Sequence, residues 1–482
     1  MSADSGYTLA LDQGTLSSRA LVFDGNGSLV HLEQQAIALR RIDQRRVEQD
    51  PDEILQSMQS VLGACLGNCS IPASRISAAG LATQRSSIVA WRPSDGQALS
   101  PVLSWQDTRG HDWLARFGDQ ASRIEDITGL RLSAHYGVSK IAFLLEHNEQ
   151  VSRAAAQGDC VITPLASFLL YHLADEQKPV IDIANASRTL LCDLSTADWS
   201  MQLLDLFGIE ADILPACRPV RADYGRLRAT AIPLKAVNGD QTAALYCNGE
   251  PSTDRLQVNL GSGAFVLAPI DRQQIEQPGF KADRLLAGIA YSDASELDYI
   301  IEGTVNGAAS ALDWLCRRHG LPVDSRLDGK HLEQQVNVVF INAIGGLGSP
   351  LWRSDIAPVF VDLNGRPIHP GFEQAYIAVL ESIVFLLQLN IERLRRFKTQ
   401  LTAMEISGGL SRVDRINQAL ADMTGLPVAR RDIAEATARG IAWLAGDQPS
   451  AWVDGGIDKR WSPRANPRLK QRFELFKRFV EQ

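Results

Sequence analysis

A carboxylate, a glycine and a hydroxyl follow one another near the start of the chain. Asp12 ends an apolar run at residues 8–11, and Gly14 and Thr15 come just before an alternating segment at residues 17–23. This order predicts a strand, a tight turn and a returning strand. The glycine lets backbone N–H groups approach a phosphate, the hydroxyl donates to it, and the aspartate can hold Mg²⁺ through water. The segment therefore suggests a nucleotide site, although a simple β-hairpin would explain the same residues.

The same arrangement occurs again about 250 residues further along the chain. Residues 255–268 predict a strand, a turn made by Gly261, Ser262 and Gly263, and a returning strand. Two such hairpins at this separation suggest a duplicated fold with a nucleotide between its halves.

The elements that must position these residues alternate between strands and helices. A helix is predicted over residues 50–66, with Asp50 as its cap, and a buried strand over residues 76–81. Arg85 and Trp105 both follow predicted strands, where an open α/β sheet normally places its ligand contacts. The pattern favours an α/β protein with a binding site at the strand ends.

With these motifs the chain resembles the FGGY family of carbohydrate kinases, and within it the glycerol kinase branch. The opening D-Q-G-T-x-S-S-R of that branch is present at residues 12–19, and residues 182–189 match the family's N-A-S-R-T segment. The resemblance spans roughly residues 7–478. It implies two ribonuclease-H-like domains of the actin and hexokinase type with a nucleotide cleft between them. The expected domains are residues 1–238 and 239–482, which meet at a crossing over residues 233–238.

The resemblance also implies a set of site residues. ATP and Mg²⁺ are the expected cofactors, with Asp12 and Asp240 on the metal side. The nucleotide is expected to contact Gly14, Thr15, Ser17, Arg19, Gly261, Ser262, Gly408 and Gly409. The acceptor pocket is expected to include Arg85, Ser86, Trp105, His135, Gln241 and Phe265.

Asp240 occupies the position of the family's catalytic aspartate, in A-V-N-G-D-Q-T-A-A-L. A carboxylate within hydrogen-bond reach of an alcohol can accept its proton during phosphoryl transfer. An ordinary aspartate pKa suffices, because the proton can leave late. The competing interpretation is a helix N-cap, which suits an aspartate before Thr-Ala-Ala-Leu equally well.

Four positions depart from the glycerol kinase pattern. Ser86 stands where that branch has a glutamate, and His135 aligns with a substrate-binding tyrosine unless a one-residue gap brings Tyr136 there. Leu16 replaces a hydroxyl in the first hairpin, and Val413 replaces an asparagine beyond the glycine pair. The changes in the acceptor pocket favour a different acceptor, since an unpaired buried polar group costs about 1–3 kcal/mol.

Composition narrows the class of protein. The 482 residues are 45% hydrophobic and carry a formal net charge of −8, which argues against nucleic acid as a partner. There is no uninterrupted apolar run of about 18 residues, and the start of the chain lacks a signal-peptide pattern, so we expect no membrane span and a cytoplasmic location. Seven scattered cysteines fit reduced thiols. The basic tail, with Phe473, Phe476 and Val480 among its charges, predicts a docked amphipathic helix.

The expected function is ATP-dependent phosphorylation of a hydroxyl on a small sugar or polyol. Glycerol itself and a four- to seven-carbon sugar or polyol remain alternative acceptors, with a slight preference for the second. A relative that binds a sugar or nucleotide without transferring phosphate is a further alternative, motivated by Leu16 and Val413. A chaperone or filament ATPase would share the fold but would not need Arg85, Trp105 and Asp240 together. A homodimer is possible in this family, although no stripe in the sequence specifies one.

Overall fold

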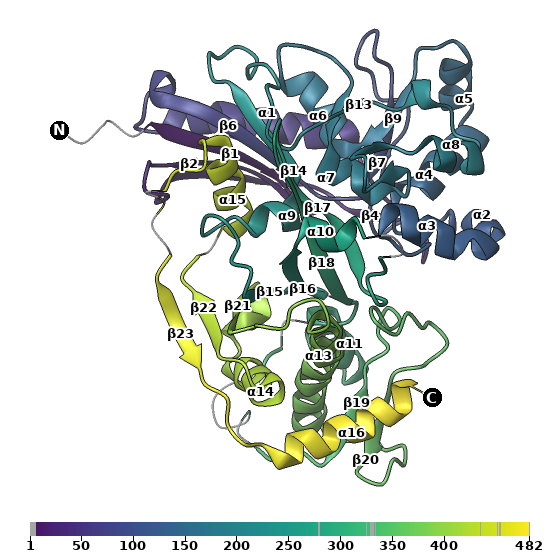
Figure 1. Ribbon diagram of the computed structural model, residues 1–482, viewed down its shortest axis with the longest axis vertical. Coiled ribbons are helices and arrows are strands. Elements are labelled where there is room, and N and C mark those ends of the chain that lie inside the picture. The colour runs from purple at the N-terminus through teal and green to yellow at the C-terminus, as the bar shows by residue number, and fades with distance from the viewer. Residues whose placement is uncertain are drawn as a thin grey trace.

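The computed structural model describes residues 6–277, 280–323, 325–327, 332, 334–433, 435–450, 452 and 455–481. Figure 1 shows two lobes, one built mainly from the first half of the chain and one mainly from the second half. The N-terminus lies on the first lobe, and the C-terminal helix runs along the far side of the second. The mixed α/β, two-domain fold predicted from the sequence is confirmed.

A five-stranded sheet forms the centre of the first lobe. Its strand order is β14 (Leu234–Gly239), β6 (Ile76–Thr83), β1 (Tyr7–Gln13), β2 (Ser17–Phe23) and β3 (Leu29–Ala36). β1 runs antiparallel to β2 and parallel to β6, and β6 runs parallel to β14. The carboxyl ends of β1, β6 and β14 therefore meet at one edge of the sheet.

Helix α1 (Pro51–Asn68) packs against β2 and β3 of this sheet. Asp50 is its N-cap, and the Asp50 side chain accepts hydrogen bonds from the backbone N–H groups of Asp52 and Glu53. Pro51 occupies the first helical position, where its missing N–H costs nothing. The cap predicted from the sequence is confirmed.

A second, smaller sheet extends the first lobe. Its strand order is β4 (Arg40–Arg41), β5 (Val47–Gln49), β8 (Val102–Leu103), β7 (Ile88–Trp91) and β9 (Val161–Pro164). The helices around it include α3 (Ala121–Thr128), α4 (Gly137–His147), α5 (Glu149–Ala156), α6 (Leu165–Leu173) and α8 (Met201–Phe207). Ile88, Leu103 and Ile141 share an apolar core here, separate from the main core of the molecule.

A seven-stranded sheet forms the second lobe. Its strand order is β17 (Leu286–Ser292), β18 (Leu297–Val305), β16 (Ala264–Ile270), β15 (Arg255–Leu260), β21 (Ala403–Ser407), β22 (Val428–Arg431) and β23 (Ile457–Trp461). The strands β15 and β16 are the second predicted hairpin, and they pair in antiparallel fashion. The helices that pack in this lobe include α11 (Ala309–Arg318), α13 (Phe372–Leu394) and α14 (Asp414–Thr424).

Helix α13 crosses the interior of the second lobe. By length and composition it could span a membrane, but 94% of its most apolar window is buried inside the structure, as in a core helix. It packs against α14, β18 and the two-stranded sheet of β19 (Val338–Ile341) and β20 (Val359–Asp362). The tail forms α16 (Pro467–Glu481), which buries Phe473, Phe476 and Val480, as predicted.

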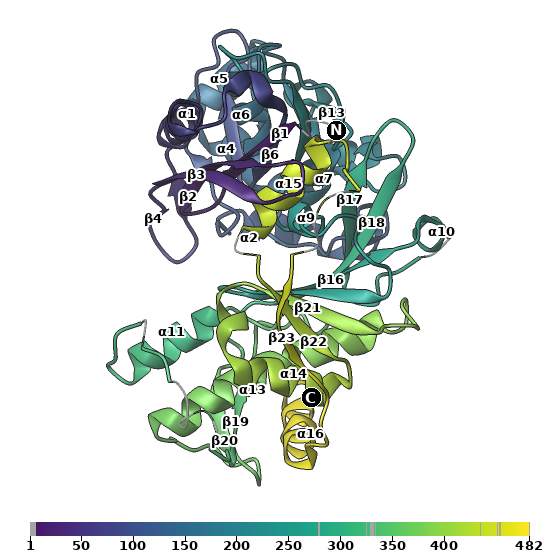
Figure 2. The ribbon, with the colours of Figure 1, turned by 90° about the vertical axis from the view of Figure 1, so that its left-hand side faces the viewer.

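The path of the chain between the two lobes differs from the path predicted from the sequence. Residues 233–238 were expected to be a crossing, but β14 is a full strand of the first sheet, parallel to β6. Helix α15 (Ala436–Ala445), which comes late in the sequence, returns to pack against β1, β6 and β14 (Figures 1 and 2). It crosses α9 (Asp240–Ala244) so closely that a Cβ on Gly440 would lie 1.8 Å from the Ala243 carbonyl oxygen.

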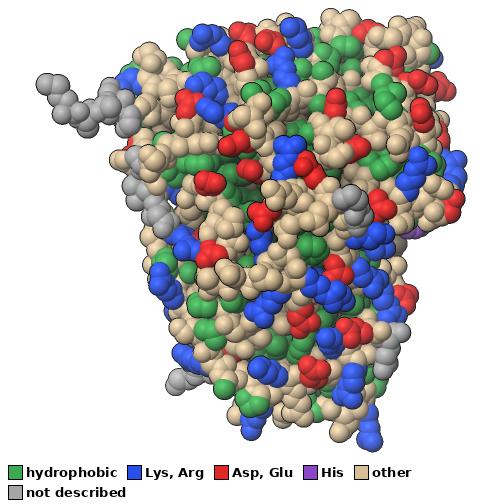
Figure 3. All heavy atoms as spheres, viewed as in Figure 1, with side chains coloured by type: hydrophobic (Ala, Val, Ile, Leu, Met, Phe, Trp, Pro, Cys, Tyr) green, Lys and Arg blue, Asp and Glu red, His purple; other side chains and the backbone are tan. Residues whose placement is uncertain are grey.

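Figure 3 shows acidic and basic side chains interspersed over the face drawn.

Candidate active site

The first hairpin places a carboxylate and a guanidinium opposite each other. Asp12 and Arg19 are partners in the antiparallel pairing of β1 and β2, so their side chains share a face of the sheet. Arg19 Nη1 lies 3.7 Å from Asp12 Oδ2 and 2.8 Å from Glu435 Oε2. Glu435 stands just before α15, so this contact joins residues more than 400 positions apart in the sequence. Gly14 N donates to the Ser17 carbonyl oxygen and closes the turn.

Burial raises the pKa of Asp12 to about 7. Arg19 lowers this pKa, while the charges of Asp240 and Glu435 raise it further. Two further carboxylates thus act on Asp12 at this end of the sheet, and the negative charge favours a cation here. Among the described residues, no group of three His, Cys, Asp or Glu side chains is close enough to hold a metal ion without other ligands.

Asp240 is the first residue of α9, directly after β14. Gly239 is the N-cap of that helix, and Asp240 Oδ1 accepts a hydrogen bond from the next backbone N–H, of Gln241, at 2.8 Å. The alternative that Asp240 is the N-cap is therefore wrong. The side chain is 31% exposed, and Arg85 Nε lies 3.8 Å from its Oδ1. Burial raises the pKa of Asp240 and Arg85 lowers it, and burial is the larger effect, so the pKa lies above the ordinary aspartate value that would already suffice for the proton transfer.

A buried ion-pair network holds Arg85 in place. Both terminal guanidinium nitrogens of Arg85 donate to Glu302 Oε2 at 3.2 Å, and Arg188 Nη2 donates to Glu302 Oε1 at 2.9 Å. The two arginines hold the pKa of Glu302 at about 2, against the effect of burial. The Arg85 side chain passes over Gly239, where a Cβ would lie 2.6 Å from its Cγ and Cδ. A glycine before the catalytic candidate is thus a steric requirement.

An aromatic pair connects the nucleotide hairpin with the predicted acceptor pocket. Trp105 Nε1 donates to the Thr15 hydroxyl at 3.0 Å, and the Trp105 ring meets the His135 ring edge-on, with 5.7 Å between centroids. Burial lowers the pKa of His135 well below its usual range, and Lys140, Arg188 and Arg85 lower it further. His135 is therefore neutral, with one ring nitrogen able to donate and one able to accept. The Tyr136 ring packs edge-on against His135 and beneath Arg188.

The segment carrying His135 is held by a buried lysine on α4. Lys140 Nζ donates to the carbonyl oxygens of Ala134, His135 and Tyr136 at 3.2, 2.5 and 3.3 Å. Burial lowers the pKa of Lys140 to about 7. The three hydrogen bonds from one ammonium group to these carbonyls fix the backbone at His135.

The three other residues predicted for the acceptor pocket differ in their contacts. Ser86 is buried with φ of +63°, and its hydroxyl faces the Arg188 carbonyl oxygen at 3.4 Å. Gln241 Oε1 is buried and has no hydrogen-bond partner in the part of the chain that the structure describes, so it could accept from a ligand hydroxyl. Phe265 pairs with Thr304 across β16 and β18, which puts it on the same sheet face as Glu302.

The second hairpin and the glycine pair meet at the ends of two parallel strands. β15 ends at Leu260 and its neighbour β21 ends at Ser407. Gly408 has φ of +85°, and a Cβ there would lie 2.6 Å from the Leu260 carbonyl oxygen, so only glycine fits. The carbonyl of Ser262 accepts hydrogen bonds at the start of α11, and its side chain is exposed. Gly261, Ser262, Gly408 and Gly409 thus share one edge of the second sheet.

Four residues of this site were not predicted from the sequence. Glu302 lies inside an apolar strand, Lys140 lies inside an apolar helix, and Glu435 precedes α15. Arg188 lies in the segment at residues 182–189 that matches the family motif, and no site role was predicted for it. The signal that could have found Glu302 and Lys140 is a charge inside an otherwise apolar element, which is buried only when paired.

Comparison with known proteins identifies the family. The model of the N-terminal domain of the FGGY family of carbohydrate kinases matches residues 7–247, and the C-terminal domain model matches residues 256–447. The chain belongs to the FGGY family. It is an ATP-dependent kinase that phosphorylates a small sugar or polyol.

Among curated FGGY proteins, the chain is similar to several named glycerol kinase. One from Brucella ovis is 31% identical over 474 residues, which cover 95% of this chain and 93% of that protein. One from Polaromonas naphthalenivorans is 32% identical over 473 residues, which cover 94% of this chain and 92% of that protein.

Solved FGGY structures share the whole fold. A Plasmodium falciparum glycerol kinase with ADP superimposes with a TM-score of 0.84 at 22% identity, covering 99% of this chain and 98% of that chain. A gluconate kinase from Lactobacillus acidophilus superimposes with a TM-score of 0.83 at 18% identity, covering 98% of this chain and 97% of that chain. Proteins with different named acceptors therefore share this architecture, and acceptor choice must come from pocket residues.

Proposed function

We propose that the enzyme transfers the γ-phosphoryl group of ATP to a primary hydroxyl of a four- to seven-carbon sugar or polyol, with Asp240 as the base. The acceptor oxygen forms a bond to the γ-phosphorus, the bond to the bridging oxygen of ADP breaks, and the hydroxyl proton passes to Asp240. The raised pKa of Asp240 supports this role, because a carboxylate that holds a proton more readily is a better acceptor. Arg85, fixed by Glu302, would orient the acceptor beside it.

Mg²⁺ is proposed to lie near Asp12 and Asp240. Carboxylate oxygens are the ligands that this ion prefers, and it usually keeps several waters and binds substrate phosphates as well. Because no three acidic side chains converge among the described residues, phosphate oxygens and water would have to complete the coordination. The ion would neutralise charge on the phosphates, and the backbone N–H groups of the two hairpins would hold their oxygens.

The choice against glycerol depends on Ser86. At the position where the glycerol kinase pattern has a carboxylate, this chain has a short side chain whose hydroxyl is directed to the Arg188 carbonyl oxygen. Losing that carboxylate removes an acceptor for glycerol hydroxyls and leaves space for a longer molecule. His135, neutral and packed against Trp105, adds a donor and an acceptor for further hydroxyls.

Glycerol remains the second candidate, because the curated relatives named glycerol kinase are about 31% identical over nearly the whole chain. A panel of glycerol and four- to seven-carbon polyols and ketoses, in an assay coupled to ADP release, separates the two. We expect kcat/KM for one of the longer acceptors to exceed that for glycerol by at least about tenfold. Ser86→Glu should move the preference toward glycerol. If glycerol is the best acceptor of the unmodified enzyme, the proposed acceptor class is wrong.

A further inference from the structure

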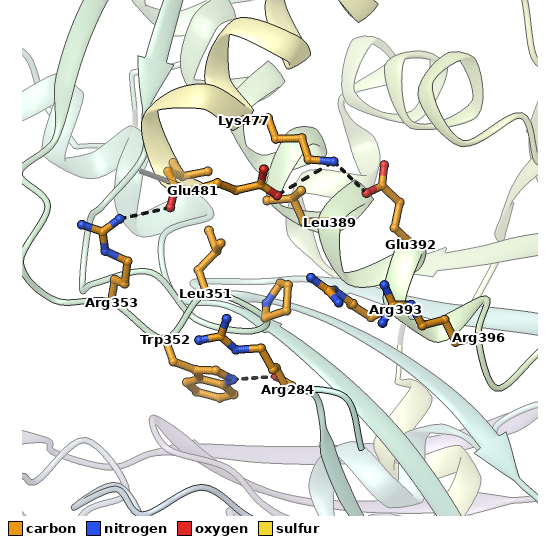
Figure 4. Close-up of a pocket in the computed structure, with 12 residues that line it drawn as sticks. Arg284, Leu351, Trp352, Arg353, Leu389, Glu392, Arg393, Arg396, Lys477 and Glu481 are labelled. Atoms are coloured by element: carbon orange, nitrogen blue, oxygen red, sulfur yellow. Dashed lines mark hydrogen bonds and ion pairs between the residues drawn. The ribbon is translucent and has the colours of Figure 1, made fainter. Parts of the chain in front are cut away.

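A cavity of about 450 Å³ lies in the second lobe, away from the predicted active site (Figure 4). Its walls come from the turn before β17, from the loop at residues 350–353, and from the facing parts of α13 and α16. A space of this size is in the range that holds small-molecule ligands. None of the residues assigned to the ATP or acceptor sites lines it.

The lining is basic, although the chain as a whole carries a net charge of −8. Five basic side chains, but only two acidic ones, line the cavity. The basic side chains are those of Arg284, Arg353, Arg393, Arg396 and Lys477. Figure 4 shows Arg284 and Arg393 extending toward the same space beside Leu351.

Nearby carboxylates neutralise most of this charge: Arg353 pairs with Asp355, and Lys477 lies near both Glu392 and Glu481. Among the described residues, Arg393 and Arg396 share one carboxylate, and the exposed Arg284 has none. Asp283 pairs with both Arg393 and Arg396, at 3.3 and 2.6 Å, so one carboxylate serves two arginines. Lys477 lies 3.6 Å from Glu392. The guanidinium of Arg284 has no ion pair within the part of the chain that the structure describes, while its backbone carbonyl accepts from the Trp352 indole at 2.6 Å.

The arginines do not gather here merely because a helix ends nearby. Cations are favoured at a helix C-terminus, which would explain Arg393 and Arg396 at the end of α13. However, Arg284 and Arg353 come from two other segments, and Lys477 comes from α16. Arg395 shares the end of α13 but lies outside the lining and donates to the Thr424 carbonyl oxygen, so not every basic residue there turns toward the cavity.

Two residues of the wall also adopt a strained backbone. Arg284 has φ of +68° and Trp352 has φ of +53°, and so does their neighbour Asp283 with +49°. Non-glycine residues in this region are strained and persist only where the surroundings hold them. Arg284 and Trp352 both line the cavity, and the guanidinium carbon of Arg131, from the first lobe, lies 5.6 Å from the centroid of the Trp352 ring.

We propose that this cavity is a binding site for a small molecule bearing more than one phosphate group, separate from the ATP site. Guanidinium groups match phosphate oxygens through paired hydrogen bonds, and an arginine without an ion pair gains most from such a ligand. Arg284 and Arg393 would contact the phosphates, and Trp352 would report binding because it forms part of the wall.

The test uses the full chain without nucleotide, because ADP itself carries two phosphate groups and would compete for the proposed site. The cavity variants then distinguish binding in this cavity from binding in the catalytic cleft. Inorganic pyrophosphate and glucose 1,6-bisphosphate serve as probes in calorimetry and in tryptophan fluorescence. We expect at least one of them to bind with a Kd below about 1 mM. Arg284→Gln should weaken that binding at least about tenfold and leave kcat unchanged. Trp352→Phe should remove most of the fluorescence change.

Arg395→Gln is the matched control, because it removes a guanidinium from the same helix end without touching the cavity. Arg393→Gln is a second cavity variant, in case Arg284→Gln fails to fold. If neither probe binds to the nucleotide-free enzyme, or if Arg395→Gln weakens binding as much as both cavity variants do, the proposed site is wrong.

Discussion

Asp12 carries a carboxyl group that folding buries among other negative charges. Its pKa rises from the usual 3.8 to about 7, mainly because burial disfavours the charged form. Between about pH 4 and pH 7 the folded state therefore binds a proton that the unfolded state has released. Ionisation of Asp12 therefore reduces the free energy of unfolding as the pH rises through this window. The whole of this reduction is present above about pH 7.

Removing this charge should stabilise the ligand-free protein. We expect Asp12→Asn to raise the melting temperature by about 2 °C or more at pH 8 and by less at pH 5. The same variant should lose Mg²⁺-dependent activity, because it lacks the carboxylate that we propose faces the metal. Thermal denaturation at both pH values checks the first expectation, with Asp212→Asn at an exposed site as the control. A destabilised variant at pH 8 would contradict the account.

Glu302 makes the opposite contribution, since two arginines hold its pKa at about 2. Glu302→Gln would leave Arg85 and Arg188 as buried cations without their shared carboxylate. We expect a loss of about 3–5 kcal/mol in the free energy of unfolding, together with a higher KM for the acceptor. Denaturant unfolding and steady-state kinetics measure the two effects. Glu296→Gln, on the exposed turn before β18, should change neither.

At the scale of elements, Lys140 on α4 positions the segment at residues 134–136. Lys140→Met removes the donor to three carbonyls, so we expect the KM for the acceptor to rise at least about fivefold, with the KM for ATP within twofold. In the unmodified enzyme, the acceptor KM should rise as the pH passes about 7, because a neutral amine is a weaker donor. The methionine variant should lose that pH dependence. Equal increases in both KM values would point to a general loss of structure instead.

Helix α14 begins without a side-chain cap. Val413 is its N-cap residue, and its side chain cannot accept a hydrogen bond from the first turn. Val413→Asn should therefore increase the free energy of unfolding by about 1 kcal/mol. Val413→Ala, which also lacks a cap, should give no gain. Chemical denaturation of the two variants decides whether the position acts through the helix.

The elements that the sequence predicted are those with local signals. Asp50 and Pro51 indicate the start of α1. The apolar run of α13 and the amphipathic pattern of α16 likewise predict helices. The two glycine hairpins were found because their turns depend on neighbouring residues alone. The acceptor and nucleotide assignments themselves stay predictions, although the structure brings Asp12, Arg85 and Asp240 close together.

What the sequence could not predict depends on contacts between distant segments. Glu302 meets Arg85 across more than 200 residues, and Glu435 meets Arg19 across more than 400. No local pattern specifies such pairs. The return of α15 to the first sheet is a further example, since its close crossing with α9 depends on Gly440 lying against Ala243.

On the scale of the whole molecule, the proposed active site draws on both halves of the chain. The first sheet supplies Asp12, Arg85 and, after β14, Asp240, while the second supplies Glu302 and the glycine turns. Arg19 and Glu435 join the first hairpin to the late segment before α15. Closing the lobes on ATP and an acceptor would exclude water, which otherwise competes for the phosphoryl group.

The central claim is that Asp240 accepts the proton of the acceptor hydroxyl. The most direct measurement is the rate of acceptor-dependent ADP formation by Asp240→Asn, with ATP binding measured in parallel by calorimetry. We expect kcat to fall by at least about 10³-fold while the Kd for ATP stays within about threefold. A variant whose turnover remains within tenfold of the unmodified enzyme would contradict it.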